Sequence, residues 1–306
     1  MPAATEGASE RFRGLDRWDT ADILEALWAG QSRAVAACLS ALPAVGRAID
    51  DAGTRLGSRG RLIYIGAGSS GLIAALDALE LGSTFDWPAE RLAIVLAGGM
   101  DFSRGLDSGA EDDPAAARAR LRDLNCGPAD VVIGVSASGS SRFTVAALEE
   151  ARAAGALTIA VACNADSALL RAALHPVLVE TGAEVISGST RLGAGTAQKL
   201  ILNLFSTALM VRLGAVFDNL MVKVRPENEK LRQRCAAMVG RIAGCTPETA
   251  ADALARTGSV KLAVLDLAGA DGASASAALG QARGNLRTAL ETCMGPARRA
   301  VDEERS

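Results

Sequence analysis

Residues 62–82 read LIYIGAGSSGLIAALDALELG, and this stretch indicates the fold class. Leu62 to Ile65 is a short apolar run, typical of a strand that is buried on both faces. A loop rich in glycine and serine follows at once, and the pattern over 70–82 has the spacing of a helix. A buried strand, a tight loop and a helix in this order are the repeating unit of a parallel α/β sheet.

The same alternation continues along the chain. Four more apolar runs predict buried strands, at 92–96, 131–135, 157–162 and 177–179. Helical patterns lie between most of them or follow them, at 114–124, 142–154, 167–173 and, as a long apolar helix, 192–213. Strands that are apolar throughout need helices on both faces, so we expect an α/β/α sandwich around a parallel sheet.

The flanking regions are helical in pattern. Asp19 and Thr20 predict a helix start, with the helix running to about Ala29, and a second pattern covers 31–57. Pro43 within that pattern should end or kink a helix. From about residue 246 the chain predicts three short helices, TPETAADALART, SVKLAVLDLA and SASAALGQARGNLRTAL. We therefore expect three parts: an N-terminal arm with helices in 1–58, the α/β domain in 59–240, and a small helical subdomain with the tail in 241–306.

Composition excludes several classes of protein. A net charge of −3 over 306 residues provides no basic surface for nucleic acid, and no apolar run is long enough for a membrane span. The first residues, MPAATEGASERFRG, lack the apolar segment of a signal peptide. The six cysteines form no C-x-x-C pair, so zinc and redox motifs are absent. We expect a cytoplasmic protein with no nucleic-acid or membrane partner.

The only histidine, His175, precedes Pro176, and we expect it in a surface loop. A histidine-rich metal site or a Ser-His-Asp triad would have to use this residue.

Three loops that join a predicted strand to a helix could hold an anion. They are 66–71, 136–141 and 187–190, and all are rich in glycine, serine or threonine. Free N–H groups at a helix start, with nearby hydroxyl donors, suit a phosphate group. The same residue types also cap helices without binding any ligand. The candidate phosphate-binding residues are Gly68, Ser69, Ser70, Gly71, Ser136, Ser138, Gly139, Ser141, Ser189 and Thr190.

The first loop also satisfies G-x-G-x-x-G, the fingerprint of dinucleotide-binding domains. That alternative requires an acidic residue at the end of the second strand. Asp86 has roughly the right separation but lies before that strand, at 92–96, so a nicotinamide cofactor is disfavoured.

Two glutamates could carry acid–base chemistry. Glu80 lies late in the helix after the first loop, with Asp77 one turn earlier on the same face, and Glu111 lies just before Asp113-Pro114. Asp113 followed by proline reads as a helix cap. Taken alone, either glutamate could be a solvated surface charge.

Longer motifs in the chain resemble a known family. Gly182–Arg191 (GAEVISGSTR) with Ala194–Leu200 (AGTAQKL) closely resembles the signature of N-acetylmuramic acid 6-phosphate etherases. Asn219–Val222, Asn228–Leu231 and Gly60–Gly68 resemble that family as well, and the similarity spans roughly residues 5 to 290. The resemblance implies a sugar-isomerase (SIS) domain that binds phosphosugars, and it implies a homodimer. It implies no metal and no organic cofactor.

The family's activity is removal of the D-lactyl ether at C3, which leaves N-acetylglucosamine 6-phosphate and D-lactate during recycling of cell-wall peptidoglycan. The resemblance therefore implies a carbon–oxygen lyase of carbohydrate metabolism. By this resemblance Glu80 is the acid at the ether oxygen and Glu111 the base at C2, and their separation of 31 residues (111 − 80) agrees with the family.

The sequence departs from the family at three cationic positions near the loops, which are Leu72, Ser140 and Gly193 here. Two other functions share the sugar-phosphate ligand: a non-catalytic sensor and an aldose–ketose isomerase. Only the etherase would release D-lactate, and a sensor would not need both glutamates.

The long predicted helix at 192–213 is apolar nearly all round, with Leu200, Leu204 and Val211 among its residues. Such a helix must be buried, and one sheet covers only one side of it. A partner subunit could cover part of the rest, so a homodimer is expected.

Overall fold

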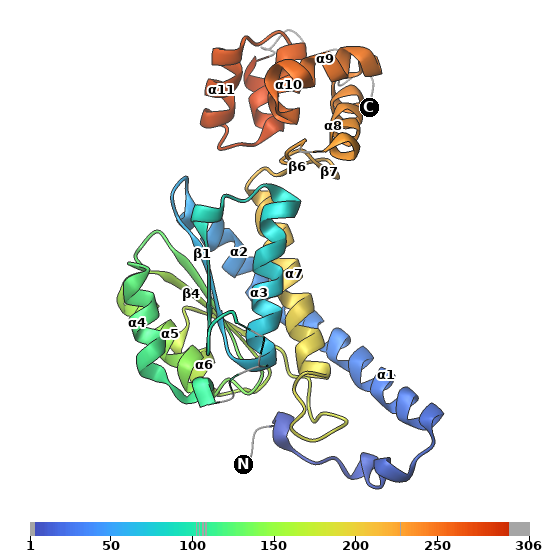
Figure 1. The fold of residues 1–306 in the computed structure, drawn as a ribbon, viewed down its shortest axis with the longest axis vertical. Helices are drawn as coiled ribbons and strands as arrows, with labels where there is room; N and C mark the ends of the chain where they lie inside the picture. Colours follow the sequence, from blue (N-terminus) through green and yellow to red (C-terminus); the bar gives the residue numbers. More distant parts are fainter. Residues whose placement is uncertain are drawn as a thin grey trace. The chain divides into compact units, whose positions relative to one another are not determined.

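The computed structural model describes residues 4–101, 103, 105, 107, 109–226 and 228–293 (Figure 1). The chain forms two compact units. Unit 1 comprises Met1–Glu80 and Pro88–Thr207, and unit 2 comprises Leu81–Trp87 and Ala208–Ser306. The three-part division expected from the sequence, at 58/59 and 240/241, remains a prediction.

Unit 1 is built around a five-stranded parallel sheet. Its strands are β1 Leu62–Gly66, β2 Leu92–Leu96, β3 Val131–Val135, β4 Leu157–Ala162 and β5 His175–Leu178, in the order β2-β1-β3-β4-β5. Gly66 pairs in register with Leu96 and Val135, so these strands end at one edge of the sheet. All five predicted strands are confirmed, with the last beginning two residues early.

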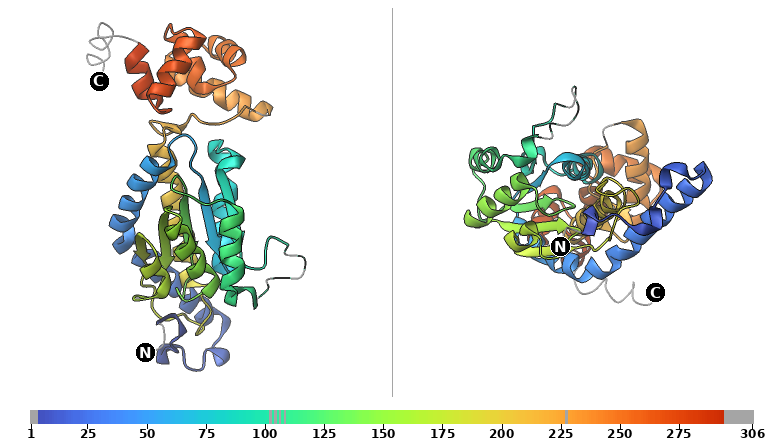
Figure 2. Two further views of the ribbon diagram at one scale, coloured as in Figure 1. Left: turned by 90° about the vertical axis from the view of Figure 1, so that its left-hand side faces the viewer. Right: turned by 90° about the horizontal axis from the view of Figure 1, so that it is seen from below.

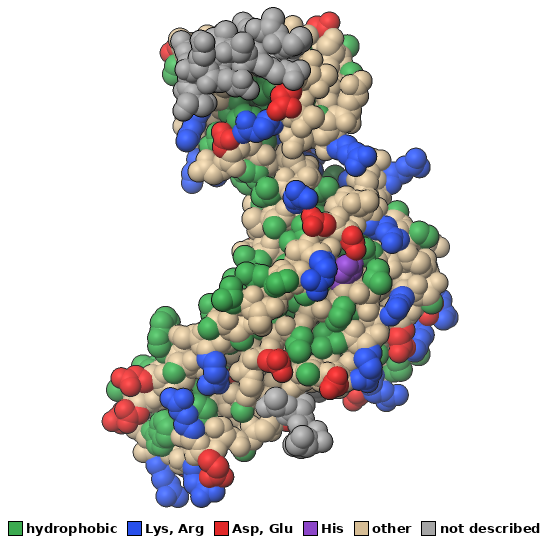
Figure 3. Space-filling model, turned by 180° about the vertical axis from the view of Figure 1, so that it is seen from behind, with side chains coloured by type: hydrophobic (Ala, Val, Ile, Leu, Met, Phe, Trp, Pro, Cys, Tyr) green, Lys and Arg blue, Asp and Glu red, His purple; other side chains and the backbone are tan. Residues whose placement is uncertain are grey.

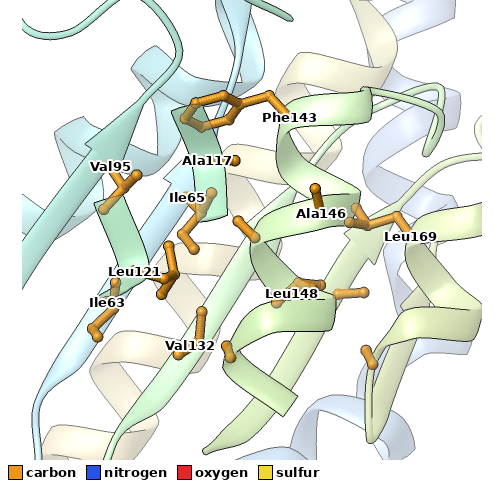
Figure 4. Close-up of a cluster of buried hydrophobic side chains, with 14 of the residues drawn as sticks. Ile63, Ile65, Val95, Ala117, Leu121, Val132, Phe143, Ala146, Leu148 and Leu169 are labelled. Atoms are coloured by element: carbon orange, nitrogen blue, oxygen red, sulfur yellow. The ribbon is translucent and has the colours of Figure 1, made fainter. Parts of the chain in front are cut away.

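Three helices cover one face of the sheet: α4 Pro114–Asp123, α5 Arg142–Ala153 and α6 Ala168–Ala172. Figure 4 shows Ile63 and Val132 of the sheet packed with Leu121 of α4 and Leu148 of α5. Gly134 allows α5 to approach closely, because a Cβ there would lie 2.8 Å from Leu148 Cδ1. The small residue at Gly134 thus allows α5 to pack closely against the sheet.

The helices α2 Leu42–Leu56, α3 Gly68–Phe85 and α7 Gly193–Arg212 belong to the opposite layer, as Figures 1 and 2 show. The Tyr64 hydroxyl donates to Asp77 Oδ2 (3.0 Å), and Ser206 Oγ donates to Asp77 Oδ1 (3.1 Å). One buried carboxylate therefore joins β1, α3 and α7. The predicted α/β/α sandwich is confirmed.

The first N-terminal helix starts as predicted, whereas the second starts at Leu42 and not near residue 31. Asp19 caps α1 Thr20–Ala37 by accepting from Asp22 N, and the helix continues well past Ala29. A 3-10 helix, Cys38–Ala41, separates α1 from α2. Pro43 does not end a helix: it lies in the first turn of α2, where a missing N–H costs nothing. Other 3-10 helices are Ala4–Glu6, Glu10–Phe12, Leu15–Arg17, Ala89–Arg91 and η6 Gly109–Asp112.

The prediction of a surface loop at His175 was wrong. His175 is the first residue of β5, its side chain is only 12% exposed, and Nε2 lies 2.9 Å from Asp51 Oδ2. The extended backbone that Pro176 favours is used here inside a strand. The face drawn in Figure 3 shows this histidine in purple.

Unit 2 is mainly helical. A short hairpin, β6 Val216–Phe217 and β7 Leu220–Met221, precedes α8 Glu229–Ala243, α9 Pro247–Thr257, α10 Val260–Leu267 and α11 Gly272–Gln281, and residues 286–293 are also helical. The three tail helices predicted from the sequence correspond to α9, α10 and the stretch from α11 onward. Their apolar faces form one core with α8.

Among the described residues, no single helix is long and apolar enough to span a membrane. The pair α10 and α11 reaches that apolarity only when taken together across a bend of 117°.

Candidate functional site

The first loop is tightly folded against its own helix. Gly66 ends β1 and Gly68, with φ of +55°, begins α3. A Cβ on Gly66 would lie 2.6 Å from Gly71 Cα, and a Cβ on Gly71 would lie 2.8 Å from Gly66 C, so neither Gly66 nor Gly71 has room for a side chain. The first N–H groups of α3 have no partner within the helix, because no preceding turn supplies a carbonyl. The loop thus presents donors at the carboxyl edge of the sheet, where ligands of such sheets bind.

The second loop follows β3 and lies against the first. Ala137 N donates to Ser70 Oγ at 3.3 Å, which joins the two loops directly. Gly139 N donates to Ser136 Oγ (3.2 Å), and Ser140 Oγ donates to Ser138 Oγ (2.9 Å). Hydroxyls and backbone N–H groups therefore gather between the starts of α3 and α5.

Ser141 has a different role from its neighbours. Its Oγ accepts from Thr144 N (3.4 Å) and from the Thr144 hydroxyl (3.0 Å), and the residue is buried. Ser141 is thus the N-cap of α5, the alternative role that serine in such a loop can have.

The third loop differs because a carboxylate occupies the start of its helix. Glu184, only 4% exposed, accepts from Gly193 N (2.9 Å) and from Ala194 N (2.8 Å). Gly195 N donates to Thr190 O. The first N–H groups of α7 are therefore satisfied within the chain, and what this loop offers a ligand is the hydroxyls of Ser189 and Thr190.

The N-terminal arm connects the second and third loops. Asn164 Nδ2 donates to Thr5 Oγ1 (2.9 Å) and to Ala137 O (3.1 Å). Gly188 N donates to Thr5 O (3.2 Å), and Ser187 Oγ donates to Glu6 O (2.8 Å). Sequence reasoning missed Thr5, Asn164 and the role of Glu184. Only Glu184 could have been found, because it lies within the signature at 182–191.

Glu111 lies at the same edge of the sheet as the first two loops. It is half-buried in η6, between the end of β2 and the start of α4. A Cβ on Gly98, just after β2, would lie 3.5 Å from Ala110 Cβ, which keeps this segment beside the carboxyl end of β2. The Glu111 side chain makes no hydrogen bond or ion pair with another described residue.

Glu80 lies elsewhere on unit 1. Its side chain is 51% exposed, and Lys199 Nζ of α7 lies 3.2 Å from Glu80 Oε2. Asp77, one turn earlier, is 2% exposed, so the two carboxylates of this helix do not share an environment as their spacing suggested. The lysine holds the Glu80 carboxylate against α7.

Within one chain, Glu80 and Glu111 do not lie close together. Glu80 follows Gly68 by twelve residues (80 − 68), which is about 18 Å along a helix that runs back from the carboxyl edge. Glu111 stays near that edge. The first two loops thus lie close to Glu111, whereas Glu80 needs another arrangement to reach a ligand bound at these loops.

The described residues contain no cluster of three His, Cys, Asp or Glu side chains that could hold a metal ion. The chemistry available at this edge of the sheet is hydrogen bonding to an anion, with one carboxylate beside it.

The chain is similar in sequence to several known proteins. Residues 33–163 match the SIS domain. A curated N-acetylmuramic acid 6-phosphate etherase of Streptomyces coelicolor is 43% identical over 95% of this chain and 94% of its own. Its counterpart from Deinococcus radiodurans is 45% identical over 87% of this chain and 88% of its own.

Solved structures are more distant. A protein of Escherichia coli, solved as a complex, has a TM-score of 0.48 and 17% identity, covering 66% of this chain and 97% of its own. A phosphoheptose isomerase from Francisella tularensis has a TM-score of 0.44 and 18% identity, covering 64% of this chain and 98% of its own.

Proposed function

The chain belongs to the N-acetylmuramic acid 6-phosphate etherase family, and we propose that it cleaves the D-lactyl ether of N-acetylmuramic acid 6-phosphate. The observation that supports this most is identity above 40% with two such etherases over nearly the whole chain. The described loops add a donor-rich edge suited to a phosphate group. We place the chain among the carbon–oxygen lyases.

The proposed reaction needs one base and one acid. With the sugar ring open, the C1 aldehyde makes the C2 proton acidic, and Glu111 removes it. The C3–O bond breaks as a double bond forms between C2 and C3, and Glu80 gives its proton to the departing lactate oxygen. Water then adds across the double bond, with its hydroxyl on C3 and its proton on C2. Positioned groups of this kind contribute about 10²–10⁴-fold each.

We propose that the phosphate binds at the first two loops. The N–H groups of Ser69 and Ser70 at the start of α3 face an anion-binding position, and Ser136 and Ser138 add hydroxyls. Ser189 and Thr190 would contribute only side-chain donors, because Glu184 already satisfies the start of α7. Neutral donors converging on a dianion can hold it without a cation, since each hydrogen bond to a charged group contributes about 1.5–3 kcal/mol.

The decisive experiment incubates purified protein with N-acetylmuramic acid 6-phosphate and measures D-lactate. Release of lactate together with N-acetylglucosamine 6-phosphate supports the etherase. Conversion of a phosphosugar without lactate would replace it by an isomerase, and binding without turnover would replace it by a sensor. The unphosphorylated sugar is the control.

We propose a homodimer whose interface includes α3 and α1. Leu72, Leu76 and Leu79 form an exposed stripe along α3, at 37%, 48% and 58% exposure. Trp28 and Leu24 are exposed on α1, which extends away from the sheet in Figures 1 and 2. Apolar stripes of this size on a water-facing surface indicate an interaction site.

The dimer would also bring Glu80 of one protomer close to Glu111 of the other. In a two-fold dimer with its axis near Leu76, α3 packs antiparallel to its copy, and Glu80 lies opposite Leu72 of the partner subunit. Leu72 is one residue from the first loop, so Glu80 of one protomer would approach the substrate held beside Glu111 of the other. We propose that each active site takes one glutamate from each chain.

We also propose a cytoplasmic location. All six cysteines are free thiols, as expected in a reducing compartment.

A further inference from the structure

Two polar residues from distant parts of the chain are enclosed at the carboxyl edge of the sheet in unit 1. Thr5, in the 3-10 helix Ala4–Glu6, is 0% exposed, and Asn164, which follows β4, is 6% exposed. Figure 1 shows the first described segment beside the loop that precedes α7. Polar side chains that are buried this completely need hydrogen-bond partners, and these two have each other.

Thr5 and Asn164 form a reciprocal pair. Thr5 N donates to Asn164 Oδ1 (3.3 Å), and Asn164 Nδ2 donates to Thr5 Oγ1 (2.9 Å). One amide therefore holds both the backbone and the side chain of Thr5. Loss of the threonine hydroxyl would leave a buried N–H of the amide with one acceptor fewer.

The pair connects two of the loops that carry candidate ligand donors. Asn164 Nδ2 also donates to Ala137 O (3.1 Å) and to Ser138 O (3.4 Å), both in the second loop. Thr5 O accepts from Gly188 N (3.2 Å) in the third loop. The distance between the second and third loops therefore depends on Thr5 and Asn164.

The third loop depends on this segment more than the other loops do. Gly188 has a φ of +75°, and a Cβ on it would lie 3.1 Å from Glu6 Oε2. Ser187 Oγ donates to Glu6 O at 2.8 Å. Because a carboxylate already satisfies the first N–H groups of α7, the loop offers a ligand the hydroxyls of Ser189 and Thr190. Hydroxyls on a loop converge on a ligand only where the loop backbone is held in place.

We propose that Thr5 and Asn164 are positioning residues for phosphosugar binding, and that together they set the spacing between the second and third loops. This inference rests on the proposed binding of a phosphosugar at these loops. Both residues act through the backbone groups that they hold. A purely structural pair would change the free energy of unfolding and leave the affinity of the folded chain as it is, whereas a positioning pair changes that affinity.

Calorimetry with N-acetylglucosamine 6-phosphate on the full chain tests this role. Thr5→Val keeps the shape of the side chain and removes the hydroxyl, so it should weaken binding by about tenfold. Thr5→Ser retains the hydroxyl and should bind like the wild type. Thr158→Val is the matched control, because Thr158 is also 0% exposed and its Oγ1 accepts from Leu174 N (3.0 Å). Thr158 lies near the start of β4, at the other end of that strand from Asn164, so the control should lose stability and keep its affinity.

A double variant tests whether the two residues act as one unit. Thr5→Val and Asn164→Ala break the same bond, so the double variant should bind no more weakly than Asn164→Ala alone. Losses that multiply in the double variant would mean that Thr5 and Asn164 act independently, which would overturn the proposal.

Hydrogen exchange measures the same coupling from the side of the ligand. If the held segment favours the ligand about tenfold, the bound ligand must favour the held segment by the same factor. Saturating N-acetylglucosamine 6-phosphate should therefore slow exchange of the Gly188 amide, which donates to Thr5 O, by about tenfold. An unchanged rate at Gly188 would contradict the coupling.

The outcomes also separate this inference from the proposed loop site. Binding by the wild type that Ser138→Ala weakens and that folded Thr5→Val retains would overturn the positioning role alone. Equal losses of affinity in Thr5→Val and Thr158→Val would overturn it as well, because they would report lost stability. No binding of N-acetylglucosamine 6-phosphate by the wild type would overturn the loop site, and this inference with it.

Discussion

Two serines of the second loop, Ser138 and Ser141, have different hydrogen-bond partners. Ser138 Oγ accepts from Ser140, a neighbour in an exposed loop, and lies 3.4 Å from Ser136 Oγ, a contact in which either hydroxyl can donate. Ser141 Oγ is enclosed and caps α5 through Thr144. The same residue type, three positions apart, is thus a helix cap in one case and a proposed phosphate donor in the other.

Ser138→Ala should weaken binding of N-acetylglucosamine 6-phosphate at the loop site by roughly tenfold, about 1.4 kcal/mol, because one donor to the phosphate is lost. The unphosphorylated sugar should bind as before. Calorimetry with both ligands measures this difference. Ser141→Ala is the matched control: it should lower the free energy of unfolding by about 1 kcal/mol through loss of a cap. Equal losses for both sugars in Ser138→Ala would place the phosphate elsewhere.

The buried carboxylate of Asp77 should make stability depend on pH. Burial raises the pKa of Asp77 above its usual 3.8, although hydrogen bonds from Tyr64 and Ser206 oppose the shift. A raised pKa in the folded state means that the contribution of Asp77 to stability is fully present below pH 3.8 and is lost as pH rises through the folded-state pKa.

We therefore expect the free energy of unfolding of the wild-type chain to fall, relative to that of Asp77→Asn, as pH rises from about 4 to 7. Urea unfolding at several pH values measures this difference. Asp123→Asn, at an exposed position on α4, should show no such trend. A difference that is constant with pH would mean that Asp77 titrates alike in the folded and unfolded chain.

At the scale of elements, the strands were predictable because each is apolar throughout, as a strand covered on both faces must be. The helix ends were less predictable. Pro43 fits equally at the first turn of a helix or at a break within one, and the sequence pattern does not distinguish these positions. The end of α1 depends on packing of Ala34 and Cys38 against the rest of unit 1, which is a tertiary effect.

At the start of α7, Glu184 accepts hydrogen bonds from the first N–H groups of the helix, so these groups are not available to a ligand. Glu184→Ala should lower the free energy of unfolding by about 2–3 kcal/mol, because Gly193 N and Ala194 N lose their acceptor in a buried place. Glu180→Ala, at an exposed position nearby, should change it by less than about 0.5 kcal/mol. Chemical denaturation compares the two. A loss as small as that of the control would show that water replaces the carboxylate at little cost.

At the scale of the whole molecule, spatial neighbours distant in sequence were the least predictable. Thr5 and Asn164 are 159 residues apart and yet connect two loops. Glu80 and Glu111 present the opposite case: a resemblance pairs them, while a single chain places them apart.

If each active site takes Glu80 from one protomer and Glu111 from the other, two inactive variants should restore activity when mixed. Glu80→Gln and Glu111→Gln should each be nearly inactive alone. In a heterodimer of the two, one site combines both substitutions and the other is wild type. Random exchange of subunits makes half of the dimers mixed, so lactate release should recover to about one quarter of the wild-type rate.

The control mixes Glu80→Gln with the double variant Glu80→Gln/Glu111→Gln, which provides no wild-type site in any pairing and should stay inactive. Light scattering should give the mass of a dimer for the wild type and a monomer for Leu76→Glu, since that change places a charge at the centre of the apolar stripe on α3. Dimers that exchange subunits without regaining activity would show that both glutamates act within one chain. In that case α3 would have to move to bring Glu80 to the carboxyl edge of the sheet.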